Sequence, residues 1–176
     1  SYCICNVIIS NDREKIQHFL DHLLLEADIL KEYHPDIRDI HFGGGTPSHL
    51  TQRQFADLCE KLNELAPLHD LSQVAMEIDP RTVTRDDLKH YASLGVNRIS
   101  FGVQDFYINV QEAINRVQPP ELIDDLLLER HRFGGVNFDL LYGLPKQTRQ
   151  TISATLDHVE RMRPDRITLL KYCHAP

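Results

Sequence analysis

Segments with helical patterning alternate with short apolar segments along this chain, and this alternation restricts the fold more than any other feature of the sequence. From residue 16 to residue 30 apolar side chains recur with the three-and-four spacing of one helix face, whereas residues 74–79 form a short, largely apolar run that ends before Pro80. The same patterns predict strands over residues 37–42, 74–79, 97–103, 136–142 and 166–172. They predict helices over residues 12–33, 51–65, 84–95, 110–116, 121–133 and 151–162. Strands separated by helices indicate βαβ units and therefore an α/β protein with a parallel sheet.

Polar residues gather where the predicted strands end. They are Gly43 to Thr46, Glu77 and Asp79, Gln104 and Asp105, Asp139, and Lys171 and Tyr172, in the order of the five strands. The carboxyl ends of the strands in a parallel (β/α) barrel form one mouth, where such folds build their sites. An open doubly wound sheet has the same alternation, but five contributions to one mouth favour a barrel or a partial barrel.

Three consecutive glycines, Gly43, Gly44 and Gly45, follow the first predicted strand. Without a Cβ atom, glycine adopts positive φ angles readily and lets backbone N–H groups approach a ligand, at an entropic cost. The loop has neither the lysine and spacing of a P-loop nor the GxGxxG pattern of a dinucleotide fold. Taken alone, it predicts either a tight strand exit or a loop that contacts a polar ligand.

Glu77 and Asp79 are two residues apart in a predicted strand, so their side chains point to the same face. Glu77 interrupts an otherwise apolar segment. Because a buried carboxylate is costly unless it is paired or hydrogen-bonded, we expect Glu77 to meet a ligand or a cation. For Asp79 we favour a local role, as the cap of the turn that begins at Pro80.

Three further polar residues are candidates for a binding site. Gln104 lies two residues after Gly102, and its amide either binds a planar polar ligand or forms hydrogen bonds with the backbone of the loop. Arg116 is by default a solvated charge on a helix. Asp139 stands among apolar residues, where an unpaired charge is strongly destabilising, so we expect it to contact a ligand.

Composition limits the classes of function. The 176 residues, 41% of them hydrophobic, suffice for one domain over residues 1–176, and both ends of the chain suggest an internal fragment. A net charge of -7 argues against a nucleic-acid partner. The sequence shows neither an apolar segment long enough to span a membrane nor a signal peptide, so we expect a cytoplasmic protein without a membrane partner. The ten histidines show no metal-binding spacing. The pair Cys3 and Cys5 predicts half of a metal site or two buried thiols.

Taken in order, seven motifs resemble the oxygen-independent coproporphyrinogen III oxidases, a family of radical S-adenosylmethionine (SAM) enzymes. The motifs are Tyr2-Cys3-x-Cys5, Gly43-Gly44-Gly45-Thr46-Pro47, Glu77-x-Asp79-Pro80, Gly102-Val103-Gln104-Asp105-Phe106, Asn115-Arg116, Asp139 to Thr148, and Tyr172-Cys173-His174. They extend over almost the whole chain. The resemblance implies a partial (β/α) barrel of the radical SAM type, truncated at both ends, with its site at the carboxyl ends of the strands.

The resemblance also implies an iron–sulfur centre. In that family a CxxxCxxC motif holds a 4Fe-4S cluster, and Tyr2 and Cys3 resemble its last two positions, the aromatic residue beside the cofactor and the third ligand. Cys5 resembles an additional cysteine that does not ligate the cluster. The first two ligands would precede Ser1, so we expect the fragment by itself to be inactive.

Residues that contact SAM follow from the same resemblance. Gly44, Gly45 and Thr46 would contact its methionine end, and Glu77 would accept a hydrogen bond from one of its polar groups. A second SAM molecule is implied by the positions that Gln104, Arg116 and Asp139 match.

Cys173 matches a position where the family contacts SAM through its backbone. The thiol itself is not expected to take part.

The implied reaction is reductive cleavage of SAM, followed by oxidative decarboxylation of two propionates of coproporphyrinogen III to vinyl groups in anaerobic haem biosynthesis. It requires a porphyrinogen substrate and a reducing electron donor, and we expect a monomer. A competing interpretation is the haem chaperone branch of the superfamily, which binds and delivers haem. A haem-modifying radical SAM enzyme and a phosphate-binding barrel without iron are two more competing interpretations.

Overall fold

The computed structural model describes residues 10–173, which form one parallel sheet with helices between its strands. The five strands lie in the order β1-β2-β3-β4-β5, and every neighbouring pair is parallel. Their bounds are β1 Asp39–Phe42, β2 Gln73–Ile78, β3 Arg98–Gln104, β4 Gly135–Tyr142 and β5 Arg166–Lys171. The predicted parallel α/β sheet is therefore confirmed.

Helices fill the connections between the strands. The α-helices are α1 Arg13–Lys31, α2 Gln52–Asn63, α3 Arg85–Ser93, α4 Ile108–Ala113, α5 Pro120–Leu126 and α6 Arg149–Met162. Short 3-10 helices are η1 Pro47–His49, η2 Leu68–Asp70, η3 Pro80–Thr82 and η4 Leu127–Arg132. Side-chain caps begin several of the α-helices: Asp12 caps α1, and Thr51 and Thr84 form capping boxes with Gln54 and Asp87.

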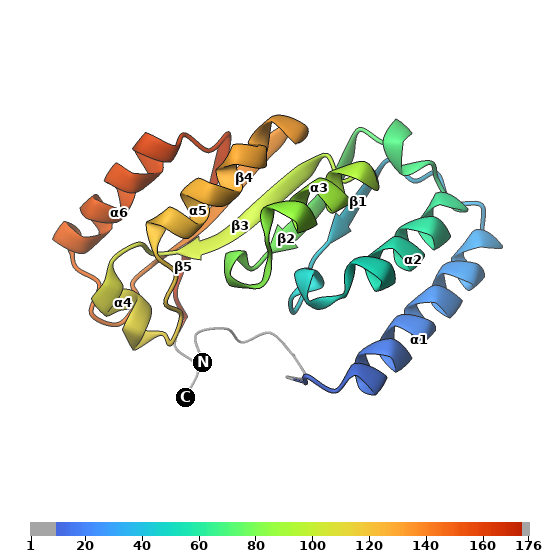
Figure 1. Ribbon diagram of the computed structural model, residues 1–176, viewed down its shortest axis with the longest axis horizontal. Coiled ribbons are helices and arrows are strands. Elements are labelled where there is room, and N and C mark those ends of the chain that lie inside the picture. Colours follow the sequence, from blue (N-terminus) through green and yellow to red (C-terminus); the bar gives the residue numbers. More distant parts are fainter. Residues whose placement is uncertain (1–9, 174–176) are drawn as a thin grey trace.

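The strand order distinguishes the two architectures that the sequence left open. In a doubly wound sheet the spatial order of the strands reverses at one point, and helices cover both faces of the sheet. Here the spatial order of the strands is the same as their order in the sequence. Right-handed crossovers between sequential parallel strands place all their helices on one face. Figure 1 shows this layer of helices in front of the sheet, with α6 and α1 at opposite ends. The fold is thus a section of a (β/α) barrel.

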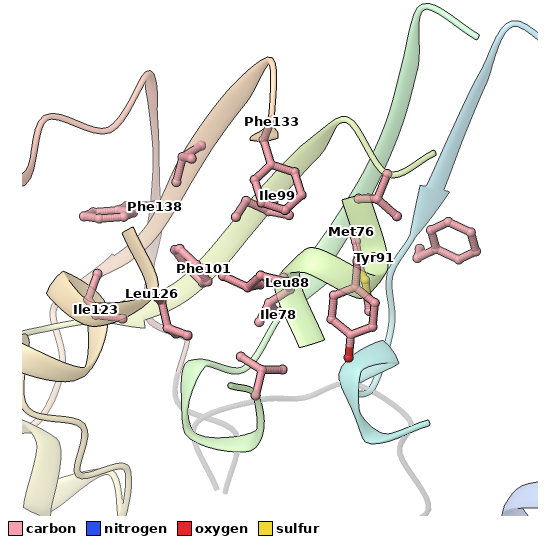
Figure 2. Close-up of a cluster of buried hydrophobic side chains, with 14 of the residues drawn as sticks. Met76, Ile78, Leu88, Tyr91, Ile99, Phe101, Ile123, Leu126, Phe133 and Phe138 are labelled. Atoms are coloured by element: carbon pink, nitrogen blue, oxygen red, sulfur yellow. The ribbon is translucent and has the colours of Figure 1, made fainter. Parts of the chain in front are cut away.

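The hydrophobic core lies between the sheet and these helices. Alternate residues of the strands, among them Met76, Ile99, Phe101 and Phe138, are fully buried there (Figure 2). Phe55 of α2 stands edge-on to both Phe42 and Tyr91, with ring centroids 5.0 Å apart in each pair. Because only this face of the sheet is packed by helices, the polar residues that alternate with the core residues point to the opposite face.

Several boundaries differ from those predicted. The helix predicted over residues 110–116 is observed as α4, Ile108–Ala113, and ends three residues earlier. The first helix ends at Lys31 rather than at residue 33, and β1 begins at Asp39, the residue that starts its pairing with β2, rather than at residue 37. The helix predicted over residues 121–133 is wrong in its second half, where α5 gives way to the 3-10 helix η4. The tighter winding accompanies the burial of Glu129, which is held by Arg85 and Arg132.

None of the helices within residues 10–173 is both long enough and apolar enough to cross a bilayer.

Candidate functional site

The polar face of the sheet brings the candidate residues into neighbouring positions. Glu77 on β2 pairs in register with Ser100 on β3, and Gly102 on β3 pairs with Asp139 on β4. Side chains two residues apart in a strand point to the same face of the sheet. Glu77, Gly102 and Asp139 therefore share one face, near the carboxyl ends of three adjacent strands. The predicted convergence is therefore present for Glu77, Gly102 and Asp139 on β2, β3 and β4. Asp105, which was predicted at the same mouth, is instead buried against Thr155 of α6.

The glycine loop is an exposed turn at the end of β1. Gly44 and Gly45 have φ angles of 73° and 52°, and a Cβ atom added to either would meet nothing within 4 Å. Positive φ explains why these two positions favour glycine. Thr46 is also exposed, at the start of η1. The loop therefore presents backbone and a hydroxyl group to whatever lies in front of it.

Gly43 lies against the ends of two flexible side chains, which a Cβ atom at this position would displace. A Cβ atom on Gly43 would lie 2.7 Å from His41 Nε2 and 3.0 Å from Glu77 Oε1. These two side chains are hydrogen-bonded to each other, with His41 Nε2 3.0 Å from Glu77 Oε1. Glu77 is therefore paired with a ring nitrogen beside the glycine loop, and its side chain remains 45% exposed.

Asp79 and Arg116 form a buried ion pair in which each side chain is 10% exposed. Asp79 caps η3 by accepting from Arg81 N, as predicted, and also accepts from the Arg81 side chain. Burial raises the pKa of Asp79, but the hydrogen bond from Arg81 and the charge of Arg116 outweigh it, so the pKa lies below its ordinary value. The default reading of Arg116 as a solvated helix charge is wrong, because the residue follows α4 and turns inward.

Gly102 allows Arg116 and Gln104 to approach the end of β3. A Cβ atom there would lie 3.0 Å from Gln104 Nε2 and 3.1 Å from Arg116 Nη2, and Arg116 Nη2 donates to the Gly102 carbonyl at 2.9 Å. Arg116 Nε is buried without a hydrogen-bond partner among the residues described. Gln104 has a φ angle of 66°, an uncommon conformation for a residue with a side chain. An unpartnered donor and a strained residue at one strand end are typical of a binding site.

Asp139 is half-buried and lies beside three polar side chains. Ser100 Oγ donates to Asp139 Oδ2 at 2.7 Å, and Asn137 Nδ2 donates to Asp139 Oδ1 at 2.8 Å. Thr168 on β5 contacts Asn137 in turn. The carboxylate is thus hydrogen-bonded, as its apolar sequence context required.

A second polar cluster fixes the loops behind this face. Asp105, completely buried, accepts from Thr155 Oγ1 at 2.8 Å, from Tyr107 N at 2.6 Å and from Gln147 Nε2 at 2.6 Å. Gln147 Oε1 accepts from Gly143 N at 2.6 Å. These contacts connect the end of β3 with the start of α6.

Three residues of the predicted site, Tyr2, Cys3 and Cys5, lie outside the described residues. Cys173 is exposed and follows β5, at the same edge as the other candidates. In residues 10–173 no group of three or more His, Cys, Asp or Glu side chains is arranged to hold a metal ion.

Sequence reasoning missed Ser100, Asn137 and Thr168. Their only signal is that each is a polar residue in a predicted strand on the same alternation as a candidate carboxylate, which is also the pattern of an ordinary solvated face.

The sequence matches the Radical SAM superfamily over residues 1–159. An oxygen-independent coproporphyrinogen III oxidase of Helicobacter pylori (strain J99) is 35% identical over 99% of this chain and 40% of its own length. The protein of the same name from Escherichia coli (strain K12) is 37% identical over 99% of this chain and 39% of its own length. This chain therefore spans about two fifths of the curated relatives it matches.

Solved structures of radical SAM enzymes are similar to this chain as well. Coproporphyrinogen III oxidase from Escherichia coli, described as a radical SAM enzyme, superimposes with a TM-score of 0.92 at 37% identity, covering 99% of this chain and 41% of that one. The radical SAM methyltransferase TsrM from Kitasatospora setae superimposes with a TM-score of 0.67 at 16% identity, covering 85% of this chain and 30% of that one. The second likeness concerns the fold alone.

Proposed function

This chain belongs to the radical SAM superfamily, and we propose that it is the SAM-binding part of an oxygen-independent coproporphyrinogen III oxidase of anaerobic haem biosynthesis. The observation that carries the proposal is 35–37% identity to enzymes of that name over 99% of the chain. The names of these relatives favour the oxidase over the haem chaperone. The whole protein would require parts beyond residues 1–176, because the chain spans 40% of such a relative.

The described residues fit a polar, zwitterionic cofactor such as SAM. Gly44 and Gly45 leave open space where side chains would stand, which lets a ligand approach the backbone. Glu77 and Asp139 offer acceptors for amino and hydroxyl groups, and Arg116 Nε is a buried donor without a partner in residues 10–173. Positively and negatively charged side chains thus lie at the same edge of the sheet, where each can bind the opposite charge of a ligand.

We assign roles on this basis. Gly44, Gly45 and Thr46 contact the methionine end of SAM, and Glu77 accepts from one of its polar groups, held in place by His41. Cys3 would ligate the 4Fe-4S cluster, and Tyr2 would contribute to cofactor binding.

Gln104, Arg116 and Asp139 contact a second SAM molecule, and the backbone at Cys173 completes the site. Asp79 keeps the Arg116 guanidinium turned toward Gly102 by taking one hydrogen bond from it at 3.2 Å.

When bound, the cluster and SAM supply the one-electron reduction and the radical that a propionate decarboxylation needs. The contribution of this chain is to bind and orient. A rigid sheet edge holds the ligand in one pose, and the oriented carboxylates and N–H groups replace water around it. The substrate is a porphyrinogen, and an electron donor must be supplied by another protein or reductant.

The test uses the full-length protein, purified and reconstituted with iron and sulfide under anaerobic conditions. Incubation with SAM, a reductant and coproporphyrinogen III is expected to release CO2 and to yield protoporphyrinogen IX. A Cys3→Ala variant is the matched control and should release none, because its cluster lacks a ligand. Haem binding without CO2 release would refute the oxidase and support the chaperone.

A further inference from the structure

We propose that Ser100, Asn137 and Thr168 are positioning residues that hold the Asp139 carboxylate for SAM, an inference that rests on the proposed function. The four side chains come from three adjacent strands and form one hydrogen-bonded cluster on the polar face of the sheet. No helix packs on this face in the part of the chain that the structure describes (Figure 1).

The number of hydrogen atoms fixes the direction of the hydrogen bonds. Asn137 Nδ2 lies within hydrogen-bond distance of Asp139 Oδ1, Ser100 Oγ and Thr168 Oγ1, at 2.8, 2.7 and 3.0 Å, yet an amide nitrogen carries only two hydrogens. The Thr168 hydroxyl also lies 3.2 Å from Asn137 Oδ1, to which it donates. The two N–H groups are then left for Ser100 and Asp139.

The Ser100 hydroxyl is the remaining hydrogen-bond donor of the cluster. Ser100 Oγ accepts from Asn137 and donates its own hydrogen to Asp139 Oδ2 at 2.7 Å. The Ser100 hydroxyl and one Asn137 N–H therefore donate to the carboxylate directly, while the other Asn137 N–H donates to Ser100 and the Thr168 hydroxyl donates to Asn137. The Asn137 side chain, in a residue only 4% exposed, has a single orientation that satisfies all its neighbours.

The cluster leaves the carboxylate free to accept more. A carboxylate has about four lone-pair sites, and the side chains described above fill one on each oxygen. Within residues 10–173, no side-chain nitrogen of Lys, Arg or His lies within 4.0 Å of an Asp139 carboxylate oxygen. Neutral donors thus fix the orientation of Asp139 without neutralising it, so that its charge remains for a cationic or hydroxyl-bearing ligand.

The experiment measures binding of SAM to the full-length, cluster-reconstituted protein by anaerobic equilibrium dialysis without reductant. Ser100→Ala removes the donor to Oδ2 and is expected to weaken binding of the second SAM molecule, the one assigned to Asp139, about tenfold, the effect of one hydrogen bond to a charged group. Thr168→Val keeps the shape but removes the donor that orients Asn137, and is expected to weaken binding about threefold. Thr168→Ser keeps the hydroxyl and should restore the wild-type affinity.

A double-mutant cycle separates positioning from general stability. In an Asp139→Ala background, Ser100→Ala is expected to change the SAM affinity by less than about twofold, because its target is gone. An equal loss in both backgrounds, or a Ser100→Ala protein with wild-type affinity, would overturn the inference while the proposed function stands. A wild-type protein that binds no SAM would overturn both.

Discussion

Asp105 offers the sharpest test of how the site is supported, because its carboxylate is completely buried and each of its contacts has a defined direction. Replacement by Asn keeps the shape and removes the charge. The amide oxygen can still accept from Thr155 and Tyr107, but the amide nitrogen then faces Gln147 Nε2, which lies 2.6 Å from the present oxygen. Two donors would meet with no acceptor between them.

Rotation of the neighbouring amide does not repair this contact. If Gln147 turned over, its nitrogen would face Gly143 N, which now donates to Gln147 Oε1 at 2.6 Å, and the Leu141 carbonyl would lose its donor. One unsatisfied pair of buried polar groups therefore remains in either arrangement. A hydrogen bond to a charged group contributes about 1.5–3 kcal/mol, and relief of the buried charge in Asp105→Asn offsets part of its loss. We expect the free energy of unfolding to fall by about 2 kcal/mol.

Urea unfolding of the purified protein, followed by circular dichroism, measures this difference. Asp157→Asn is the matched control, because Asp157 is exposed on α6 and its replacement should change the free energy by less than about 0.5 kcal/mol. An Asp105→Asn protein as stable as this control, with an unchanged dependence on urea, would show that the buried cluster does not fix the two loops.

Three further outcomes follow from individual residues. Gly44→Ala should lower the free energy of unfolding by about 1–2 kcal/mol in the same urea assay, because alanine is strained at a φ angle of 73° even where its Cβ atom meets no other atom. An unchanged free energy of unfolding would refute the claim that this position favours glycine. The hydrogen bond from Arg132 lowers the pKa of Glu129 to about 2 against the opposing effect of burial, so this residue stabilises the fold above its ordinary pKa of 4.5, and that contribution is lost as the pH falls toward 2. Glu129→Gln should therefore flatten the acid dependence of the urea midpoint, and an unchanged slope would contradict this. Burial raises the pKa of Cys59 to about 12, so iodoacetamide should alkylate it only after unfolding, as mass spectrometry of peptides would reveal; rapid labelling of the native protein would contradict its burial.

Most of the fold could be predicted because it is encoded locally. The period of apolar residues distinguishes α1 from β2, and the capping boxes at Thr51 and Thr84 fix where two helices begin. The candidate positions Glu77 and Asp139 were identifiable as carboxylates that interrupt apolar strands. These signals lie within a few residues of the feature that they predict.

What could not be predicted depends on distant partners. Arg116 is buried because Asp79, 37 positions earlier, and the Gly102 carbonyl receive its N–H groups. Nothing within a helical turn of Arg116 indicates this. The pairing of Ser100 with Asn137 likewise depends on the register of β3 and β4, which a single sequence does not specify.

The one-sided layer of helices has a consequence for how such a protein changes over time. The core residue Phe101 and Ser100 on the polar face are adjacent in sequence but face separate environments. A substitution on the open side can alter which molecule is held while the packed side stays intact. Diversification of chemistry and retention of the scaffold can thus proceed along the same strand, with alternate codons under different selection.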